Sequence, residues 1–357
     1  MSKKLHISLF HFPERCMFYA VILSALVLAG CAATPKAFID TSAMGKIIWP
    51  GPPEKPRIKF MWSITQIARS ADGKRGLVDL LAGDVAGDVT DPRTSNVLMR
   101  PYGVFVDTKE RLYVADPGAN RVTAIDTKSG SVLNIFEAGP DELQAPVGVV
   151  ADPTGRIYVA DAELKKVLVF DEKGKYLSRF EGDFKRPAGI AIDVKNSIIY
   201  VSDTPADAIY LYDLGGKRVG SIGHRGALPG EFNFPTHLFV DANGLLYVTD
   251  AMNFRIQVFG RDGKPVGTVG SLGDAYGSLD KPKGVAADSH GNIYVVDSIK
   301  DMVKIFDREG QLLLFFGDKG MNLGEFWLPA GVFIDSKNMI YVADPYNMRI
   351  QVFQLLE

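Results

Sequence analysis

Short apolar runs separated by polar turns recur in a fixed order from residue 101 onward. Each run spans four to seven residues, is rich in Val, Ile, Tyr and Phe, and is bounded by Asp, Gly or Asn. This pattern predicts β-strands joined by tight turns, because β-branched and aromatic residues favour strands and the bounding residues favour turns. The tetrapeptide Tyr-Val-x-Asp marks the repeats most clearly and occurs at 113–116, 158–161, 200–203, 247–250, 294–297 and 341–344.

The spacing of these tetrapeptides defines a repeat of four strands. Consecutive copies are 45, 42, 47, 47 and 47 residues apart. Before each copy a Pro opens an apolar run that ends in Asp six residues later, and after each copy come an alternating segment, a second turn and a final run. Four antiparallel strands repeated at this spacing are typical of the blades of a β-propeller. The sequence therefore predicts an all-β fold, a six-bladed β-propeller of four-stranded antiparallel blades, over residues 57–357.

The sixth repeat lacks a fourth strand, and an upstream segment is a candidate to supply it. No further apolar run follows "RIQVFQLLE" (349–357), whereas "RIKFMWSIT" (57–65) is an isolated strand-like run. An incomplete last blade would leave an edge of unpaired N–H and C=O groups. We therefore expect residues 57–65 to close the last blade as an N-terminal strand. Residues 66–100 are predicted to form a linker with one short helix candidate, and residues 101–357 to form the six repeats.

Residues 1–30 have the pattern of a signal peptide. Three basic residues precede an uninterrupted apolar run at 17–30, which is too short to span a bilayer comfortably. The run ends in "LAGC", and this resembles the bacterial lipobox, in which the Cys, here Cys31, carries a lipid. A plain cleaved signal and an uncleaved anchor are the alternatives. Residues 31–56 are rich in Pro and are predicted to be a tether between a lipidated Cys31 and the propeller.

Composition and charge narrow the class of partner. The chain has 357 residues, 46% hydrophobic and 23% charged, as is usual for a globular protein. Removing residues 1–30 leaves 37 basic and 41 acidic residues, a net charge of −4. This balance, together with export, argues against a nucleic-acid partner. The single remaining Cys would carry the lipid, so neither a disulfide nor a thiolate metal site is expected.

The repeats resemble the NHL family of β-propellers. "PVGVVADPTGRIYVAD" (146–161) and "DAMNFRIQVF" (250–259) match the repeat of that family, and "ALPGEFNFP" (227–235) and "NLGEFWLP" (322–329) match its G-E-F-x-x-P connector. The resemblance covers about residues 100–357. It implies the propeller fold but leaves activity open, because such propellers include protein-binding, RNA-binding and catalytic members.

Two aspartates recur in every repeat, one at the end of the first strand and one closing Tyr-Val-x-Asp. A ring of carboxylates could bind calcium, but an active site needs a few unlike residues in one place. An Asp can instead cap the turn that follows it or accept N–H groups of a nearby loop. The sequence favours this structural interpretation for all twelve.

The loops after Tyr-Val-x-Asp differ between the repeats. Five residues after the Asp stand Arg121, Lys166, Ala208, Arg255, Met302 and Arg349. Because the six positions share one register, the four basic residues form a candidate binding face for an anionic ligand or an acidic partner. Arg121, Lys166, Arg255 and Arg349 could also pair with carboxylates of their own or the next blade, and the resemblance to NHL repeats favours that alternative.

His237 is a departure from the repeat. The second residue after the opening Pro is Gly at 103, 148, 189, 284 and 331, where the innermost strands crowd the axis, but it is His in the fourth repeat. His237 is therefore a candidate channel residue, although a lone His is more often a hydrogen-bonded spacer. The other histidines after residue 30, His224 and His290, fall in a connector and a turn, so a three-His zinc site is not expected.

These observations favour a lipid-anchored envelope propeller that binds protein or carbohydrate partners without catalysis. The alternative is an envelope enzyme of the lactonase or lyase type, with calcium or zinc in the central channel. The first interpretation requires no cofactor. We expect a monomer in the bacterial cell envelope, attached to the membrane through the lipid alone. Ala32 after the Cys favours the outer membrane, with the protein facing the periplasm.

Overall fold

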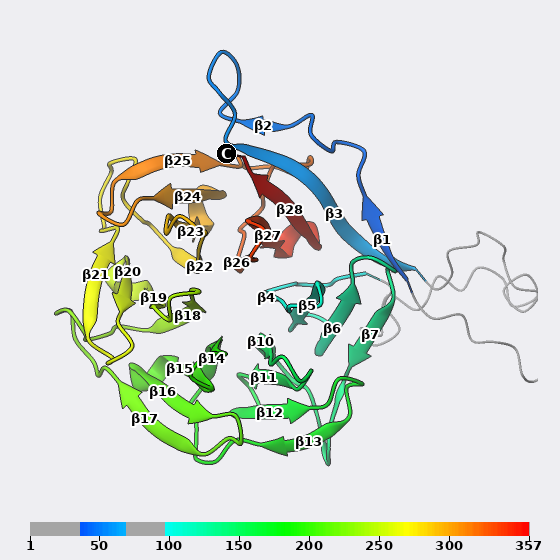
Figure 1. The fold of residues 1–357 in the computed structure, drawn as a ribbon, viewed down its shortest axis with the longest axis vertical. Helices are drawn as coiled ribbons and strands as arrows, with labels where there is room; N and C mark the ends of the chain where they lie inside the picture. Colours follow the sequence, from blue (N-terminus) through cyan, green and yellow to red (C-terminus); the bar gives the residue numbers. More distant parts are fainter. Residues whose placement is uncertain (1–35, 69–96, 357) are drawn as a thin grey trace, which may run out of the picture. The chain divides into compact units, whose positions relative to one another are not determined.

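The computed structural model describes residues 36–68 and 97–356. The predicted signal peptide, Cys31 and the helix candidate in the linker lie outside these residues. In the described part, six antiparallel sheets surround a central axis, as the predicted six-bladed β-propeller requires (Figure 1). The prediction of an all-β fold with four-stranded blades is confirmed.

The first three blades each have four strands, which run outward from the axis in sequence order. Blade one contains β4 (Gly103–Val106), β5 (Arg111–Asp116), β6 (Arg121–Asp126) and β7 (Val132–Ile135). A small hairpin, β8 (Glu137–Ala138) and β9 (Asp141–Glu142), leads into blade two, which contains β10 (Pro146–Ala151), β11 (Ile157–Asp161), β12 (Lys166–Phe170) and β13 (Tyr176–Arg179). Blade three contains β14 (Pro187–Asp193), β15 (Ile198–Asp203), β16 (Ala208–Asp213) and β17 (Arg218–Ile222).

The next three blades repeat this order. Blade four contains β18 (Pro235–Val240), β19 (Leu246–Asp250), β20 (Arg255–Phe259) and β21 (Pro265–Val269), and blade five contains β22 (Pro282–Ala287), β23 (Ile293–Asp297), β24 (Met302–Phe306) and β25 (Leu312–Phe316). Blade six begins with β26 (Val332–Ile334), β27 (Met339–Asp344) and β28 (Arg349–Leu355). Short 3-10 turns lie between the second and third strands of blades three to six: η1 (Thr204–Ala206), η2 (Ala251–Asn253), η3 (Ser298–Lys300) and η4 (Pro345–Asn347).

An N-terminal strand completes the sixth blade, as the sequence predicts. β3 (Ile58–Ala68) pairs antiparallel with β28, and Phe353 lies opposite Phe60 in the register (Figure 1). Phe60 is fully buried, and its ring centroid lies 5.7 Å from that of Phe353. The closing strand therefore contributes both backbone pairing and core packing.

The segment predicted to be a Pro-rich tether differs from that expectation from Lys36 onward. β1 (Lys36–Asp40) and β2 (Ile48–Trp49) both pair with the outer side of β3, so the sixth sheet has six strands (Figure 1). The physical reason is that β3 would otherwise present an unpaired edge, which β1 and β2 cover. Trp49 also packs into the core, 5.7 Å from both Phe316 and Phe353.

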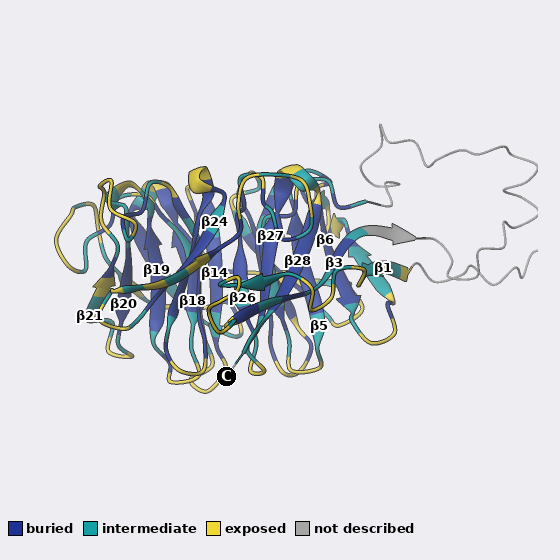
Figure 2. Cartoon of the chain, turned by 90° about the horizontal axis from the view of Figure 1, so that it is seen from above, coloured by how far each residue is buried: buried dark blue, intermediate teal, exposed yellow. Residues whose placement is uncertain are grey.

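The strands run between two faces of the ring, with burial concentrated along their middles (Figure 2). We call one the loop face; it carries the loops after Tyr-Val-x-Asp and the connectors between blades. The opposite turn face carries the turns that follow the first and third strands. In both the first and last blades the innermost strand, β4 or β26, begins at the loop face, so residues just after each opening Pro surround the loop-face end of the axis.

The innermost strands approach one another as closely as the recurring glycines suggest. A Cβ added to Gly189 would lie 2.1 Å from the carbonyl oxygen of Thr236, and a Cβ added to Gly284 would lie 2.5 Å from the amide nitrogen of Val332. Neither distance is sterically possible. Glycine is therefore required where one blade presses its backbone against the next.

Candidate functional site

The repeated aspartates hold the blades together. Asp161, at the end of β11, accepts the N–H groups of Gln144 and Ala145 just before its own blade, and the equivalent Asp116 accepts those of Met99 and Arg100. The Asp that ends each first strand caps the following turn instead. Asp152, for example, accepts the N–H groups of Thr154 and Arg156 at 2.9 and 3.0 Å and the Tyr158 hydroxyl at 3.0 Å. The structural interpretation of these carboxylates is confirmed.

The three arginines of the candidate binding face bond to groups of the protein itself. Arg255 and Arg349 each donate from Nε to the Asp that closes the preceding strand, at 2.8 Å, and Arg121 lies 3.9 Å from Asp116. Arg121 is fully buried and Arg349 is 5% exposed. At these three positions the structure shows the pairing alternative that the sequence favours, because the guanidinium groups fold back to satisfy buried carboxylates and connector carbonyls. Whether this face binds a partner remains a prediction.

Lys166, the fourth member, is placed differently. Its Nζ lies 2.6 Å from Asp141 in the β8–β9 hairpin, and both side chains are partly exposed. Each of the four basic residues therefore bonds to groups close to it in the fold. It does not bring Arg121, Lys166, Arg255 and Arg349 together into one cluster.

Burial around these pairs is reflected in their pKa values. Desolvation raises the pKa of the Asp344 carboxyl, although the Trp327 N–H and Arg349 oppose this shift. Burial likewise raises the pKa of Asp116 and lowers that of Arg121. These groups are buried members of the framework, which is a structural rather than a catalytic arrangement.

His237, the candidate channel residue, is the third residue of β18 and lies near the loop-face end of this innermost strand. Its ring stacks on that of Tyr102 with a centroid distance of 5.1 Å and an interplanar angle of 30°. Tyr102 belongs to blade one and His237 to blade four, so the pair spans the axis (Figure 1). Both ring nitrogens of His237 and the Thr236 hydroxyl are buried without a hydrogen-bond partner in the described part of the chain.

Lys283 completes this group, and its environment is unusual for a cation. Its Nζ lies 5.5 Å from the centroid of the Tyr102 ring. Burial, with the nearby charge of Lys281, lowers the pKa of Lys283 to about 8. Burial and the charge of Lys283 lower the pKa of His237 to about 3, so the imidazole is neutral at ordinary pH. We call Tyr102, Thr236, His237 and Lys283 the axial group.

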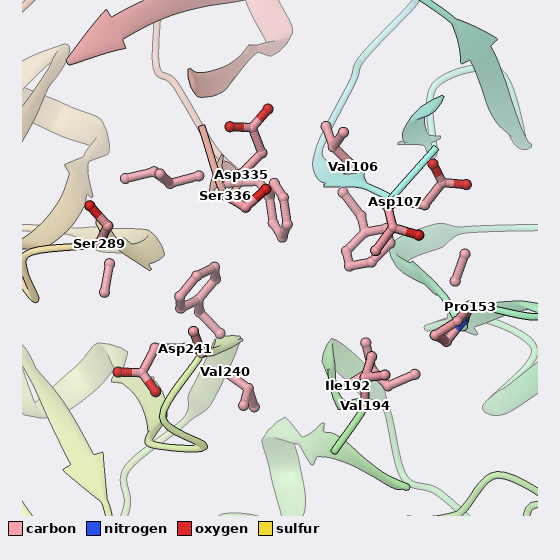
Figure 3. A pocket seen from close by; sticks show the side chains of 18 of the residues that line it. Val106, Asp107, Pro153, Ile192, Val194, Val240, Asp241, Ser289, Asp335 and Ser336 are labelled. Carbon is pink, nitrogen blue, oxygen red and sulfur yellow. The ribbon is translucent and has the colours of Figure 1, made fainter. Parts of the chain in front are cut away.

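A cavity of about 350 Å³ opens at the other end of the axis, on the turn face. Its walls are largely apolar, and Figure 3 shows Val106, Ile192 and Val240 around it with Asp241 and Asp335 near the rim. The rim carboxylates are already engaged. Asp241 Oδ1, for instance, accepts the N–H groups of Asn243 and Leu245. The cavity could receive a small apolar group, but its carboxylates are not arranged as a free acid–base pair.

The loop face carries a band of exposed hydrophobic side chains over blades four to six. We call this band the apolar crescent. Its members lie in the connectors leading into these blades or in the loops after Tyr-Val-x-Asp, and each is at least 40% exposed: Leu228, Phe234, Met252, Leu272, Tyr276, Ile299, Met321, Trp327, Tyr346 and Met348. Among the described residues, no comparably exposed large hydrophobic side chain lies in the matching loops of blades one to three.

The basic position does not predict this crescent, but the position two residues after the Asp of Tyr-Val-x-Asp does. Two residues after the Asp of each Tyr-Val-x-Asp, the first three repeats have Gly, Glu and Pro, and the last three have Met, Ile and Tyr. The change occurs halfway around the ring. Reading this position would have predicted an asymmetric loop face.

Within residues 36–68 and 97–356, no three or more His, Cys, Asp and Glu side chains are grouped so that they could hold a metal ion. His224, His237 and His290 lie on a connector, at the axis and on a turn respectively. In the same ranges, no helix has the length and apolar character needed to cross a membrane.

Comparison with protein families assigns propeller repeats to most of the ring. A family described as a 6-bladed beta-propeller matches residues 141–220 and 189–271, a beta-propeller repeat matches 270–296, and the NHL repeat matches 326–353. No protein of curated function matches the sequence.

Solved structures share the fold at low sequence identity. An auxiliary nutrient binding protein from Bacteroides thetaiotaomicron is 13% identical with a TM-score of 0.59, over 73% of this chain and 70% of its own. A streptogramin B lyase is 15% identical with a TM-score of 0.54, over 72% and 94%. Virginiamycin B lyase from Staphylococcus aureus is 15% identical with a TM-score of 0.53, over 72% and 95%. At such identities the similarity concerns the fold alone. On its sheet topology and its family matches, the chain is a six-bladed β-propeller built of NHL-like repeats.

Proposed function

We propose that this propeller is a non-catalytic binding module whose partner is a protein that covers the apolar crescent. The observation that supports this most directly is that, among the described residues, ten exposed large hydrophobic side chains lie in the loops and connectors of blades four to six and none in the matching loops of blades one to three. Exposed large apolar side chains gathered on one face often mark an interaction site. Aromatic residues and Met are also enriched where interfaces are tight.

Trp327 and Tyr346 are the strongest candidates for anchors of this interface. Their ring centroids lie 5.6 Å apart, and the Arg100 guanidinium lies 5.9 Å from the Tyr346 ring. Trp, Tyr and Arg are the residue types most often found at the energetic centre of an interface. The backbone beneath them is fixed, because the Trp327 N–H donates to Asp344 at 2.9 Å.

Met348 supplies a second argument from backbone strain. It adopts φ 52° and is 45% exposed, whereas the equivalent residue of blade one, Asn120, adopts φ 49°. Asn tolerates this left-handed conformation, but Met has no local hydrogen bond to compensate its steric cost. The fold imposes this conformation at the equivalent position of every blade, so an exposed Met in place of a better-suited Asn supports a role in binding.

The competing proposal of an envelope lyase or lactonase has less support. The repeated carboxylates are occupied by backbone N–H groups, Arg side chains or Tyr hydroxyls, as Asp250 and Asp344 illustrate. Carboxylates whose oxygens are already hydrogen-bonded within the framework are not placed to exchange a proton with a substrate. An activity of the purified protein that is lost on changing the axial group would favour the enzyme instead.

Site-specific cross-linking tests the proposed face. A photoreactive residue at position 252 or 346 should cross-link one envelope protein reproducibly, whereas a matched position in blade two, Glu163, should not. Equal capture from position 163 would contradict the proposal. With the captured protein purified, Trp327→Ala should weaken binding by about 30-fold or more, as expected for an interface anchor, and Glu163→Ala should have little effect.

We also propose that the module is anchored to the envelope through a lipid on Cys31, which the "LAGC" pattern supports. Such an anchor would hold the ring at the membrane. Cys31→Ser should move the protein from the membrane fraction to the soluble fraction. Unchanged membrane retention would count against lipidation.

A further inference from the structure

We propose that the axial group is a carboxylate-binding site and that the partner on the apolar crescent inserts a carboxylate there. This inference rests on the proposed function for the identity of the partner, but the site itself can be tested without one. The carboxylate belongs to a polypeptide, either an acidic side chain or a C-terminal group.

The first supporting observation is a concentration of unpaired polar atoms. Nδ1 and Nε2 of His237 and Oγ1 of Thr236 are buried and have no partner among the described residues. Buried polar atoms are nearly always hydrogen-bonded, so three on adjacent residues call for an additional partner. A neutral imidazole and a hydroxyl can both donate to an oxygen.

The second observation is the charge around the axis. Arg186, Lys281 and Lys283 lie close enough to influence Tyr102 or one another, and none forms an ion pair with a described residue. The two residues before each opening Pro and the residue after it include a single acidic side chain, Asp280, which pairs with Lys300 at 3.0 Å. Three cations thus gather there, and the nearest carboxylates, such as Asp203 and Asp297, accept backbone N–H groups of Arg186 and Lys281 and form no ion pair with their side chains.

The third observation is that the site departs from its own repeat. The five equivalent positions to His237 are glycines, and close packing between blades requires them. One position earlier, the axial group places a phenol, a hydroxyl and an ammonium (Tyr102, Thr236 and Lys283) where Val147, Ala188 and Ala330 stand in other blades. Polar groups that the fold does not need and burial disfavours are typical of functional sites.

A carboxylate fits these groups better than a neutral ligand does. Its two oxygens can accept from the Lys283 ammonium and from the His237 or Thr236 donor, and its charge would offset the crowding of Lys281 and Lys283. The crescent adjoins the axis, since Trp327 and Phe234 lie within two residues of an opening Pro. The preferred ligand is thus an acidic group next to apolar side chains in one polypeptide.

The test observes Lys283 directly by NMR. Lysines of the purified full chain are reductively methylated with ¹³C, and the Lys283 signal is assigned by its loss in Lys283→Arg, or in Lys283→Met if the first variant fails to fold. The probes are N-acetyl-phenylalanine, which carries a terminal carboxylate, and N-acetyl-glutamate amide, which carries a side-chain carboxylate. N-acetyl-phenylalaninamide and inorganic phosphate are the controls.

We expect the Lys283 signal to titrate near pH 8 and its midpoint to rise by about one unit or more when a carboxylate probe saturates the site. The probe with the larger effect identifies the source of the carboxylate. No saturable shift with either probe, or an equal shift with the amide or with phosphate, would overturn the proposal. These outcomes do not depend on a partner, so failed cross-linking from the crescent would overturn the proposed function and leave this site standing.

Discussion

Blades one to three and blades four to six share one backbone design but present different surfaces on the loop face. In the first half, the second residue after Tyr-Val-x-Asp is Gly118, Glu163 or Pro205, and in the second half it is Met252, Ile299 or Tyr346. In all six blades the Asp before these residues accepts the N–H group of the residue two positions before the opening Pro. The difference therefore lies in side chains that the fold does not require, which is where a binding surface can evolve freely.

The core of the two halves differs as well. Near the seam, Trp49, Phe60, Phe316, Phe326 and Phe353 form one aromatic cluster. The half that carries the apolar crescent thus also holds the closure of the ring. Rigid packing beneath a surface keeps its side chains in place for a partner.

The largest effect is expected from Phe60→Ala, which should lower the free energy of unfolding by about 3–5 kcal/mol. Phe60 is fully buried, and the cavity would lie between the closing strand and β28. Leu177→Ala on blade two is the control, since Leu177 is 48% exposed, and should change stability by less than about 0.5 kcal/mol. Equal effects in urea unfolding would show that the seam does not hold the ring closed.

A smaller contrast is expected between two basic residues at the same repeat position. Arg349→Met should cost about 3 kcal/mol or more, because Asp344 would be left buried with fewer partners and the carbonyls of Met321, Asn322 and Glu325 would lose a donor. Lys166→Met should cost less than about 1 kcal/mol, because its pair with Asp141 is partly exposed. Thermal unfolding of both variants measures the difference, and similar values would argue against a framework role for Arg349.

The smallest expected effect concerns Met348, and it tests the difference between the two halves of the ring most directly. Met348→Asn should stabilise the ring by about 0.5–1 kcal/mol, because Asn tolerates the left-handed backbone better, and should weaken binding of the partner. Asn120→Met in blade one should destabilise the ring by a similar amount and leave binding unchanged. If Met348→Asn retains full affinity in a titration with the purified partner, Met348 is not part of the interface.

Much of the fold could be predicted because the residues that specify it repeat six times. Each repeat has an opening Pro and two Asp residues at fixed spacing, and all but the fourth have an axial Gly. The local structural role of each can be inferred from its position in the repeat. The closing strand could be inferred from an unpaired edge. By contrast, β1 and β2 could not be predicted within "KAFIDTSAMGKIIWPGPPEKP" (36–56), because only the edge of β3 makes pairing there favourable.

The candidate site was only partly predictable for the same reason. The sequence identified His237 as an exception, but its contact with Tyr102 joins residues 135 positions apart across the axis. The sequence favoured pairing of the basic residues with nearby carboxylates, but spacing alone does not reveal that Arg121 is fully buried. The role of a side chain that varies between repeats depends on its contacts with other blades, which the sequence of one repeat does not show.

The closure of the ring also affects the order in which the parts of the chain fold. β3 must find β28, whose first residue stands 281 positions after the last residue of β3. Closing a loop of that length costs about 2–3 kcal/mol more entropy than closing a 15-residue hairpin, and such distant pairing slows folding. Blades one to five can form from local contacts alone. The last blade therefore acts as the final, slow step, after which an otherwise open chain of hairpins becomes a single cooperative body.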